Sequence, residues 1–477
     1  MTIADSISNV FSTANTYIWW VALVLLVVFG IFFTVKLKGL QILKINETAK
    51  LSISGVGEGK KKTRVSSFEA FCIGMGARIG VGNIAGVATA IVTGGPGAIF
   101  WMWIFAIIGS ATSFMESTLA QVFKEKKDDG QYYGGPAYYA TKGLGSRKLG
   151  IFVAILLILT FGIGFVGVQA TNATSALTGA FSFEHNSLVF GIIIMLVAGI
   201  IIFGGVKRIA RFSSKVVPVM AVIWIIFALI AIALNWKNVG NAFGMIFEYA
   251  FDTPALVGGG IGTAISIGMR RGIFSNEAGL GSIANIAASA DTSHPAKQGM
   301  IQSFGVLVDT LLVCTVTALV VLSYGSFDSI MAFGDRGAVL VQDVISSTAI
   351  GSSANIIIAA FMLVFAFTSM IGYYTMSEAN VRFIKDSKLM MNIVRIVVLV
   401  TILIASLTDT AMLDLVSDTF NALMGAINVL IVAALSKIAF EVYKDYRSQK
   451  KAGVEEPEFH RDCLKGIKHT ENITEWE

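Results

Sequence analysis

Long apolar runs separated by short polar segments dominate the chain. Each run holds roughly the 20 helical residues needed to cross a hydrocarbon core, and none shows the period-2 alternation of a barrel strand. Because backbone polar groups inside lipid must be satisfied within the segment, helices are the expected spanning element. We therefore predict an all-α membrane protein with about eleven spans, at about residues 18–36, 67–94, 98–121, 150–177, 188–204, 216–234, 254–285, 299–323, 354–378, 389–407 and 413–436.

Two of these segments are too long for ordinary spans and carry glycine clusters and charges near their middle. The first interrupted segment (67–94) contains GARIGVGNIAG, and the second interrupted segment (254–285) contains GGGIG. Glycines in membrane helices also serve close packing, but here several stand beside the charged Arg78 and the polar Asn83. We predict that both segments are helices broken within the bilayer, and we place the second break close to GGGIG.

The spans divide into one extra N-terminal helix and two groups of five, and each group begins with an interrupted segment. Because an odd number of spans separates their starts, the two groups enter the membrane from opposite sides. Interrupted helices at corresponding positions of two halves are typical of inverted-repeat transporters with a site at the bilayer midplane. We predict an N-terminal anchor helix with a basic loop (1–66), a ten-helix transport core (67–436, with repeats 67–234 and 254–436) and a charged tail (437–477) that starts as a surface helix and ends disordered.

Composition and charge support membrane insertion and suggest an orientation. Of 477 residues, 55% are hydrophobic and 14% charged, whereas soluble domains have roughly 25% charged residues. Thirty of the thirty-six Lys and Arg residues lie in alternate connections, while the opposite connections hold only Lys237 and Arg336. By the positive-inside rule the N-terminus is outside and the tail is cytoplasmic. The net charge of +5 is then a basic face toward anionic lipid, and nucleic-acid binding is not expected.

Broken helices offer both polarities that a zwitterion requires. The amides of Val81, Gly82 and Asn83 begin the outer half of the first interrupted segment, and the positive end of its dipole suits a carboxylate. The carbonyls of Gly76 and Ile79 end the inner half and suit a hard cation such as sodium.

In the second interrupted segment we expect carbonyls from Thr263 to Ser266, together with Gly268, to face the same cavity and accept an ammonium group. Asn276 and Glu277 are further candidates for substrate contact or for linking helices.

Charged side chains within spans are costly and require partners. We expect Arg78, Arg270 and Arg271 on the cytoplasmic side of the two breaks. The available counter-charges are Glu116, Glu277 and Asp309.

Five motifs together resemble the alanine or glycine:cation symporters, a family of sodium:alanine carriers. They are GVGNIAGVATAI from Gly80, TGGPGAIFWMW from Thr93, GGPAYY from Gly134, RGIFSNEAGLGS from Arg271 and HPAKQG from His294. The resemblance spans nearly the whole chain. It implies a LeuT-type fold, sodium (Na⁺) as the coupling ion, a small amino acid as substrate, and a bacterial or archaeal inner membrane.

The resemblance also implies roles for Thr368, Ser369 and Gln169, and a fourth candidate, Tyr373, follows from its position. LeuT-type carriers combine carbonyls of the first broken helix with hydroxyls of the eighth core helix in one sodium site, which here implies Thr368 and Ser369. The family pattern places a Gln in the third core helix, so Gln169 is implied to contact substrate. Tyr373, one turn beyond Ser369, is a candidate wall of the pocket.

Several alternatives remain open at this stage. A larger amide such as glutamine is a second substrate class, because pocket volume is not legible from sequence. Proton coupling is less favoured, since none of the four histidines lies mid-span. An intramembrane enzyme would need a nucleophile with a base or a metal motif, and neither is found. A sensor that binds an amino acid without transporting it is the remaining class.

Overall fold

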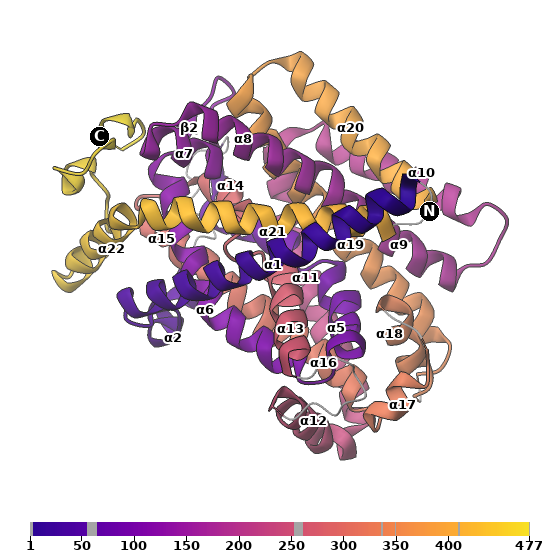
Figure 1. Ribbon diagram of the computed structural model, residues 1–477. Coiled ribbons are helices and arrows are strands. Elements are labelled where there is room, and N and C mark those ends of the chain that lie inside the picture. Colours follow the sequence, from indigo (N-terminus) through magenta and orange to yellow (C-terminus); the bar gives the residue numbers. More distant parts are fainter. Residues whose placement is uncertain are drawn as a thin grey trace.

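The computed structural model describes residues 3–54, 64–251, 261–334, 337–348, 350–408 and 411–476. Over these residues the molecule is a bundle of helices with two very short strand pairs (Figure 1). The first part of the second interrupted segment, including most of GGGIG, lies outside the described residues.

The first half of the chain folds into these elements: α1 (Ile3–Lys36), α2 (Leu40–Leu43), α3 (Ile45–Ser54), β1 (Val65–Ser66), α4 (Ser67–Arg78), the π-helical η1 (Gly82–Gly86), α5 (Val87–Gly94), α6 (Ala98–Val122), β2 (Glu125–Lys126), β3 (Tyr132–Tyr133), α7 (Pro136–Leu144), α8 (Arg147–Leu157), the π-helical η2 (Ile158–Phe165), α9 (Val166–Ala180), α10 (Asn186–Ile202), α11 (Gly205–Leu234), η3 (Trp236–Asn238) and α12 (Val239–Phe251).

The second half continues with α13 (Ile261–Asn276), α14 (Ser282–Ala288), β4 (Ala290–Asp291), α15 (Pro295–Leu307), the π-helical η5 (Val308–Cys314), α16 (Thr315–Leu322), α17 (Phe327–Met331), α18 (Gly337–Ser346), α19 (Ser353–Ile384), α20 (Lys388–Leu407), α21 (Ala411–Ala434), α22 (Ser436–Lys451), η6 (Arg461–Leu464) and η7 (Thr470–Asn472).

The predicted spans have matching helices. Among the described residues, eight helices are long and apolar enough to cross a membrane, and the bent pair 67–78 and 82–94 makes a ninth. The predicted span at 188–204 corresponds to α10, a shorter apolar helix of 17 residues. A helical membrane protein is therefore confirmed, while the total of eleven spans and the inverted repeat stay predictions.

Local chemistry fixes several helix starts. The hydroxyl of Ser66 accepts a hydrogen bond from the Glu69 amide, and the Glu69 carboxylate accepts one from the Ser66 amide, which forms a capping box at the start of α4. Ser146 and Ser387 cap α8 and α20 in the simpler way, each through its side-chain oxygen.

The N-terminal helix is an integral part of the bundle. In Figure 1, α1 and α21 lie side by side, with α2 and α22 at the end where both helices finish. Asp418 on α21 accepts hydrogen bonds from Asn15 and from the Trp19 indole, at 3.0 and 2.8 Å. Phe33 near the end of α1 packs edge-on against Phe440 of α22.

The two interrupted segments are joined at one end of the bundle. Strand β1, which precedes α4, pairs in parallel with β4, which follows α14, through Val65 with Ala290 and Ser66 with Asp291. An ion pair between Arg64 and Asp291 at 3.2 Å reinforces the pair.

The C-terminal tail corrects a prediction, because it folds back onto the protein instead of ending disordered. After α22 its side chains Phe459, Leu464, Ile473 and Trp476 are buried. The Trp476 indole donates a hydrogen bond to the Gln121 carbonyl at 2.8 Å. Four apolar side chains spread over a charged sequence do not show the periodicity of a packed element, so their burial was not legible from the sequence.

Candidate functional site

The first interrupted segment breaks where predicted. Helix α4 ends at Arg78, the chain bends by 48°, and the second half starts at Gly82. At the break the Gly80 amide donates to the Asn83 side-chain oxygen at 2.9 Å, and the Val81 amide donates to Gln169 Oε1 at 3.1 Å. Of the amides expected to bind a carboxylate, that of Val81 is thus satisfied by a side-chain oxygen, and that of Asn83 donates to the Gly80 carbonyl at 3.2 Å.

The side chain of Asn83 holds the break together. Its Oδ1 accepts from Gly80, and its Nδ2 donates to Asp309 Oδ1 at 2.7 Å. Asp309 also accepts from Ser275 Oγ at 2.8 Å, and it lies in the π-helical segment η5. Local π-helices often mark functional positions, and here η1 and η5 both supply groups at the break.

The two hydroxyls predicted on the eighth core helix lie against the inner half of the first interrupted segment. Ser369 on α19 donates a hydrogen bond to the Gly76 carbonyl at 2.9 Å. Thr368 lies beside Gly76 but donates to the Phe365 carbonyl of its own helix at 3.0 Å. One turn further, Tyr373 donates to the Ala77 carbonyl at 3.2 Å.

Glycine is required at position 80 by close approach. A Cβ there would lie 2.4 Å from Ser369 Oγ and about 3 Å from the Gln169 amide group. Ile79, whose carbonyl is a candidate cation ligand, is buried immediately before it. The structure therefore gathers the candidates Gly76, Ile79, Val81, Gly82, Asn83, Gln169, Thr368, Ser369 and Tyr373 around one break.

The second break lies further along the chain than predicted. Helix α13 runs to Asn276, and α14 begins at Ser282. Between them Glu277, Gly279 and Gly281 have φ of 56°, 86° and 75°, in the left-handed region that interrupts a right-handed helix. The Glu116 carboxylate on α6 accepts from the Gly281 amide at 2.9 Å, which stabilises the amides at the start of α14.

The prediction that Thr263, Ser266 and Gly268 bind the ammonium group assumed that the helix breaks beside them. This assumption is wrong. All three lie within the continuous helix α13, where carbonyls are engaged in the helix and not exposed at an end. Gly268 serves packing, since a Cβ there would lie 2.3 Å from the Ala98 carbonyl oxygen of α6. Arg270 and Arg271 lie in α13, the half that precedes the break, whereas they were expected in the half that follows it.

Asn276 links helices at the second break. Its Nδ2 donates to Thr310 at 3.0 Å, and its Oδ1 accepts from the Ala278 amide at 3.0 Å. Its carbonyl accepts from Arg78 Nε at 2.8 Å. Because its side chain is engaged on both sides, the structure favours the helix-linking role over substrate contact.

Arg78 connects the two breaks through buried hydrogen bonds. Besides the Asn276 carbonyl, its guanidinium donates to Gln302 and Ser113, each at 3.2 Å. Glu277 is also fully buried; the Ser282 hydroxyl lies near its carboxylate, but neither carboxylate oxygen makes a hydrogen bond of normal geometry to a described residue. The hydroxyl of Tyr373 lies near this carboxylate. A buried carboxylate at a helix break that makes no well-formed hydrogen bond is a candidate ligand for a cation.

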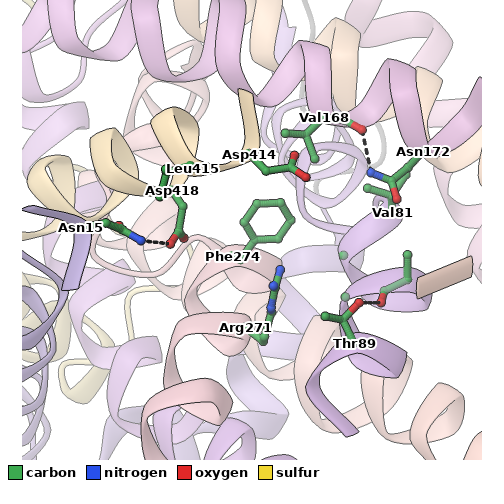
Figure 2. A pocket seen from close by; sticks show the side chains of 13 residues that line it. Asn15, Val81, Thr89, Val168, Asn172, Arg271, Phe274, Asp414, Leu415 and Asp418 are labelled. Atoms are coloured by element: carbon green, nitrogen blue, oxygen red, sulfur yellow. Dashed lines mark hydrogen bonds between the residues drawn. The ribbon is translucent and has the colours of Figure 1, made fainter. Parts of the chain in front are cut away.

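A cavity of about 310 Å³ leads to the first break. Val81 and Gly82 line it, together with Arg271, Phe274, Asp414 and Asp418. In Figure 2 the Phe274 ring lies at the centre of the view, with Asp414 and Arg271 on either side. This ring stacks on Phe165 at 4.7 Å between centroids. Sequence reasoning missed Phe274, whose only signal was its place inside the RGIFSNEAGLGS motif.

Two helices broken at adjacent points and a cavity that reaches one of the breaks define a secondary transporter of the LeuT type. A crystal structure of MhsT in complex with L-phenylalanine has this fold: it aligns with a TM-score of 0.55 and 14% identity, covering 77% of this chain and 88% of that one. The model of the sodium:alanine symporter family matches residues 4–461, so the chain belongs to that family.

The names of individual relatives refer to different substrates. The probable sodium/glutamine symporter GlnT of Bacillus subtilis is 44% identical over 460 residues, which cover 96% of this chain and 94% of the relative. The sodium/alanine symporter AgcS of Methanococcus maripaludis is 35% identical over 450 residues, covering 92% and 97%. Family membership implies sodium coupling and places the protein among carriers and not among enzymes.

Proposed function

We propose that this protein imports a small neutral amino acid, alanine or glycine, together with sodium by alternating access. The observation that carries the proposal is that the two helix breaks meet, since Arg78 at the end of α4 donates to the carbonyl of Asn276 at the end of α13. Helix ends brought together inside a bilayer supply amides for a carboxylate and carbonyls for cations.

Sodium is assigned to the inner end of the first break. Its proposed ligands are the carbonyls of Gly76 and Ile79 and the hydroxyls of Ser369 and Thr368. The Ser369 hydroxyl already lies 2.9 Å from the Gly76 carbonyl oxygen, so these two ligands are within reach of one ion. A set of neutral oxygens suits a hard monovalent cation better than a transition metal.

The amino-acid carboxylate is assigned to the amides of Val81 and Gly82. Gln169 Oε1 now accepts the Val81 amide proton and therefore holds the place of one carboxylate oxygen. On substrate binding Gln169 must turn, which presents its Nε2 donor group to the same carboxylate. Gln169 then couples occupancy of the site to the position of α9.

The ammonium group is assigned to the end of α13 and to Glu277. The Glu277 carboxylate is buried beside the Ser282 and Tyr373 hydroxyls without a hydrogen bond of normal geometry among the described residues, and it directly follows the negative end of the α13 dipole. This replaces the assignment to Thr263, Ser266 and Gly268. Tyr373 is assigned only as a wall of the site, because its hydroxyl already donates to the Ala77 carbonyl at 3.2 Å.

The cavity lined by Arg271, Phe274 and Asp414 is assigned as the entrance from outside the cell. The distribution of Lys and Arg supports an external N-terminus and a cytoplasmic tail in a bacterial or archaeal inner membrane. Rocking of the bundle that contains both broken helices then opens the site to the cytoplasm. Labelling of cysteines introduced at Lys237 and Lys468 with an impermeant reagent on intact cells tests this orientation: only the first should react.

The transport proposal is tested with purified protein in liposomes. Uptake of labelled alanine is measured with and without a sodium gradient, against a panel of unlabelled amino acids. Sodium-dependent uptake that alanine and glycine inhibit best supports the proposal. Inhibition led by glutamine would favour the second substrate class, which the similarity to GlnT supports. Uptake driven by a pH gradient without sodium would contradict sodium coupling.

A further inference from the structure

A second cavity lies away from the transport site, where α1 ends and α22 begins. It has a volume of about 640 Å³ and is bounded by the end of α1, by α2 and by one face of α22. Lys38 and Gly39 have φ of 56° and 63°, so the chain turns sharply from α1 into α2 and folds over the cavity. Figure 1 shows α2 and α22 together at this end of the bundle.

The cavity is strongly basic. It is lined by one acidic side chain, Glu441, and by six basic ones: Lys36, Lys38, Lys44, Lys444, Arg447 and Lys451.

Half of these basic groups already have partners. Arg447 pairs with Glu47 at 2.9 Å, Lys444 pairs with Glu441 at 3.1 Å, and Lys36 lies over the Phe32 ring.

The other three basic groups have no ion pair within the part of the chain that the structure describes; they are Lys38, Lys44 and Lys451. Three unpaired cations around one hollow favour an anionic ligand.

The remaining lining is apolar and continues onto the lipid-facing side of α1. Leu37 and Leu40 form a buried floor, while Leu43 at the rim is 74% exposed. Val35, the residue directly before Lys36, is 69% exposed on the same span. A small hydrated anion would leave this apolar surface exposed to water, whereas the acyl chain of a lipid would cover it.

The depth of the cavity fits a lipid headgroup. The apolar span of α1 ends at Lys36, so residues that follow it lie at the membrane surface and those before it lie in the hydrocarbon. Phosphate groups of phospholipids lie at this level, and basic pockets there attract anionic headgroups. The cavity lies at a membrane surface in either orientation of the chain.

We propose that this cavity binds one phospholipid with an anionic headgroup. Lys38, Lys44 and Lys451 contact the headgroup phosphate, and the acyl chains run over Leu43 and along the exposed side of α1. The ligand holds α22 against α1 by bridging basic groups of both. This site is independent of the transport function proposed above.

The experiment uses the full chain purified in detergent and native mass spectrometry. Phosphatidylglycerol is titrated in competition with phosphatidylcholine of the same acyl chains. The test variant replaces three lysines with glutamine at Lys38, Lys44 and Lys451. The control variant removes the same charge at exposed lysines that do not line the cavity, at Lys148, Lys385 and Lys468.

The proposal expects the unmodified protein and the control variant to retain phosphatidylglycerol in preference to phosphatidylcholine. In the test variant binding weakens about fivefold per lysine, hence about a hundredfold in total. Equal retention by the test variant would overturn the site, and so would equal binding of the two lipids. Displacement of the lipid by millimolar inorganic phosphate would show a free-anion site and would also overturn the proposal.

Discussion

Replacement of Ser369 by alanine tests the proposed sodium site most directly. The Ser369 hydroxyl is buried, and its hydrogen bond to the Gly76 carbonyl joins α19 to the first break, next to the bond from Tyr373 to the Ala77 carbonyl. Without the Ser369 hydroxyl the Gly76 carbonyl loses its partner when sodium is absent, and the ion loses one of its oxygen ligands when sodium is present. Leaving a buried polar group unsatisfied costs about 1–3 kcal/mol, which corresponds to roughly 5- to 150-fold in affinity.

We therefore expect Ser369→Ala to raise the sodium concentration for half-maximal alanine uptake by about tenfold or more. The assay is initial uptake into liposomes over a sodium titration at fixed alanine. Ser377→Ala is the matched control, because Ser377 is buried on the same helix and its hydroxyl donates to the Tyr373 carbonyl of that helix. An unchanged sodium dependence in Ser369→Ala would remove this hydroxyl from the site.

Three further predictions concern packing, charge and pH. Gly80→Ala should abolish uptake, because the added methyl group would clash with Ser369 Oγ. Gly86→Ala is the control and should retain uptake, since a Cβ added there meets nothing within 4 Å. Arg78→Met should lower the free energy of unfolding by about 3–5 kcal/mol. The reason is that Arg78 is the one fully buried guanidinium among the described residues, and the buried carboxylates Glu116, Glu277 and Asp309 would lose its positive charge. An unchanged unfolding midpoint would refute this. Burial lowers the pKa of His294 to about 4 despite Asp445, so the folded state resists protonation. Stability should then fall as pH drops from about 6.5 toward 4, and a His294→Gln variant should lack that part of the pH dependence.

The first break was predictable from sequence, and the second was not, for a physical reason. At the first break glycines adjoin Arg78 and Asn83, and polar groups of this kind have no place in an uninterrupted apolar helix. In the second interrupted segment glycines serve two different purposes. Gly268 permits close packing against α6, whereas Gly279 and Gly281 adopt positive φ. The sequence alone does not distinguish a glycine that permits close packing from one that permits positive φ.

The partners of the buried charges were equally beyond sequence reasoning. Arg78 is satisfied by Gln302, Ser113 and a backbone carbonyl, all far away along the chain. The hydroxyl pair on α19 was identified only through family resemblance, and the structure shows why composition would not suffice. Thr368 bonds to its own helix as most buried threonines do, while its neighbour Ser369 reaches across to another.

The pairing of β1 with β4 bears on how such a carrier moves. Two residues of each strand pair and so connect the ends of the two broken helices. The ion pair between Arg64 and Asp291 strengthens this connection. Any motion that separated these helix ends would first have to break the pairing of β1 with β4. The simplest motion therefore carries both helices together as one rigid piece, with sliding confined to the surfaces where that piece meets the surrounding scaffold.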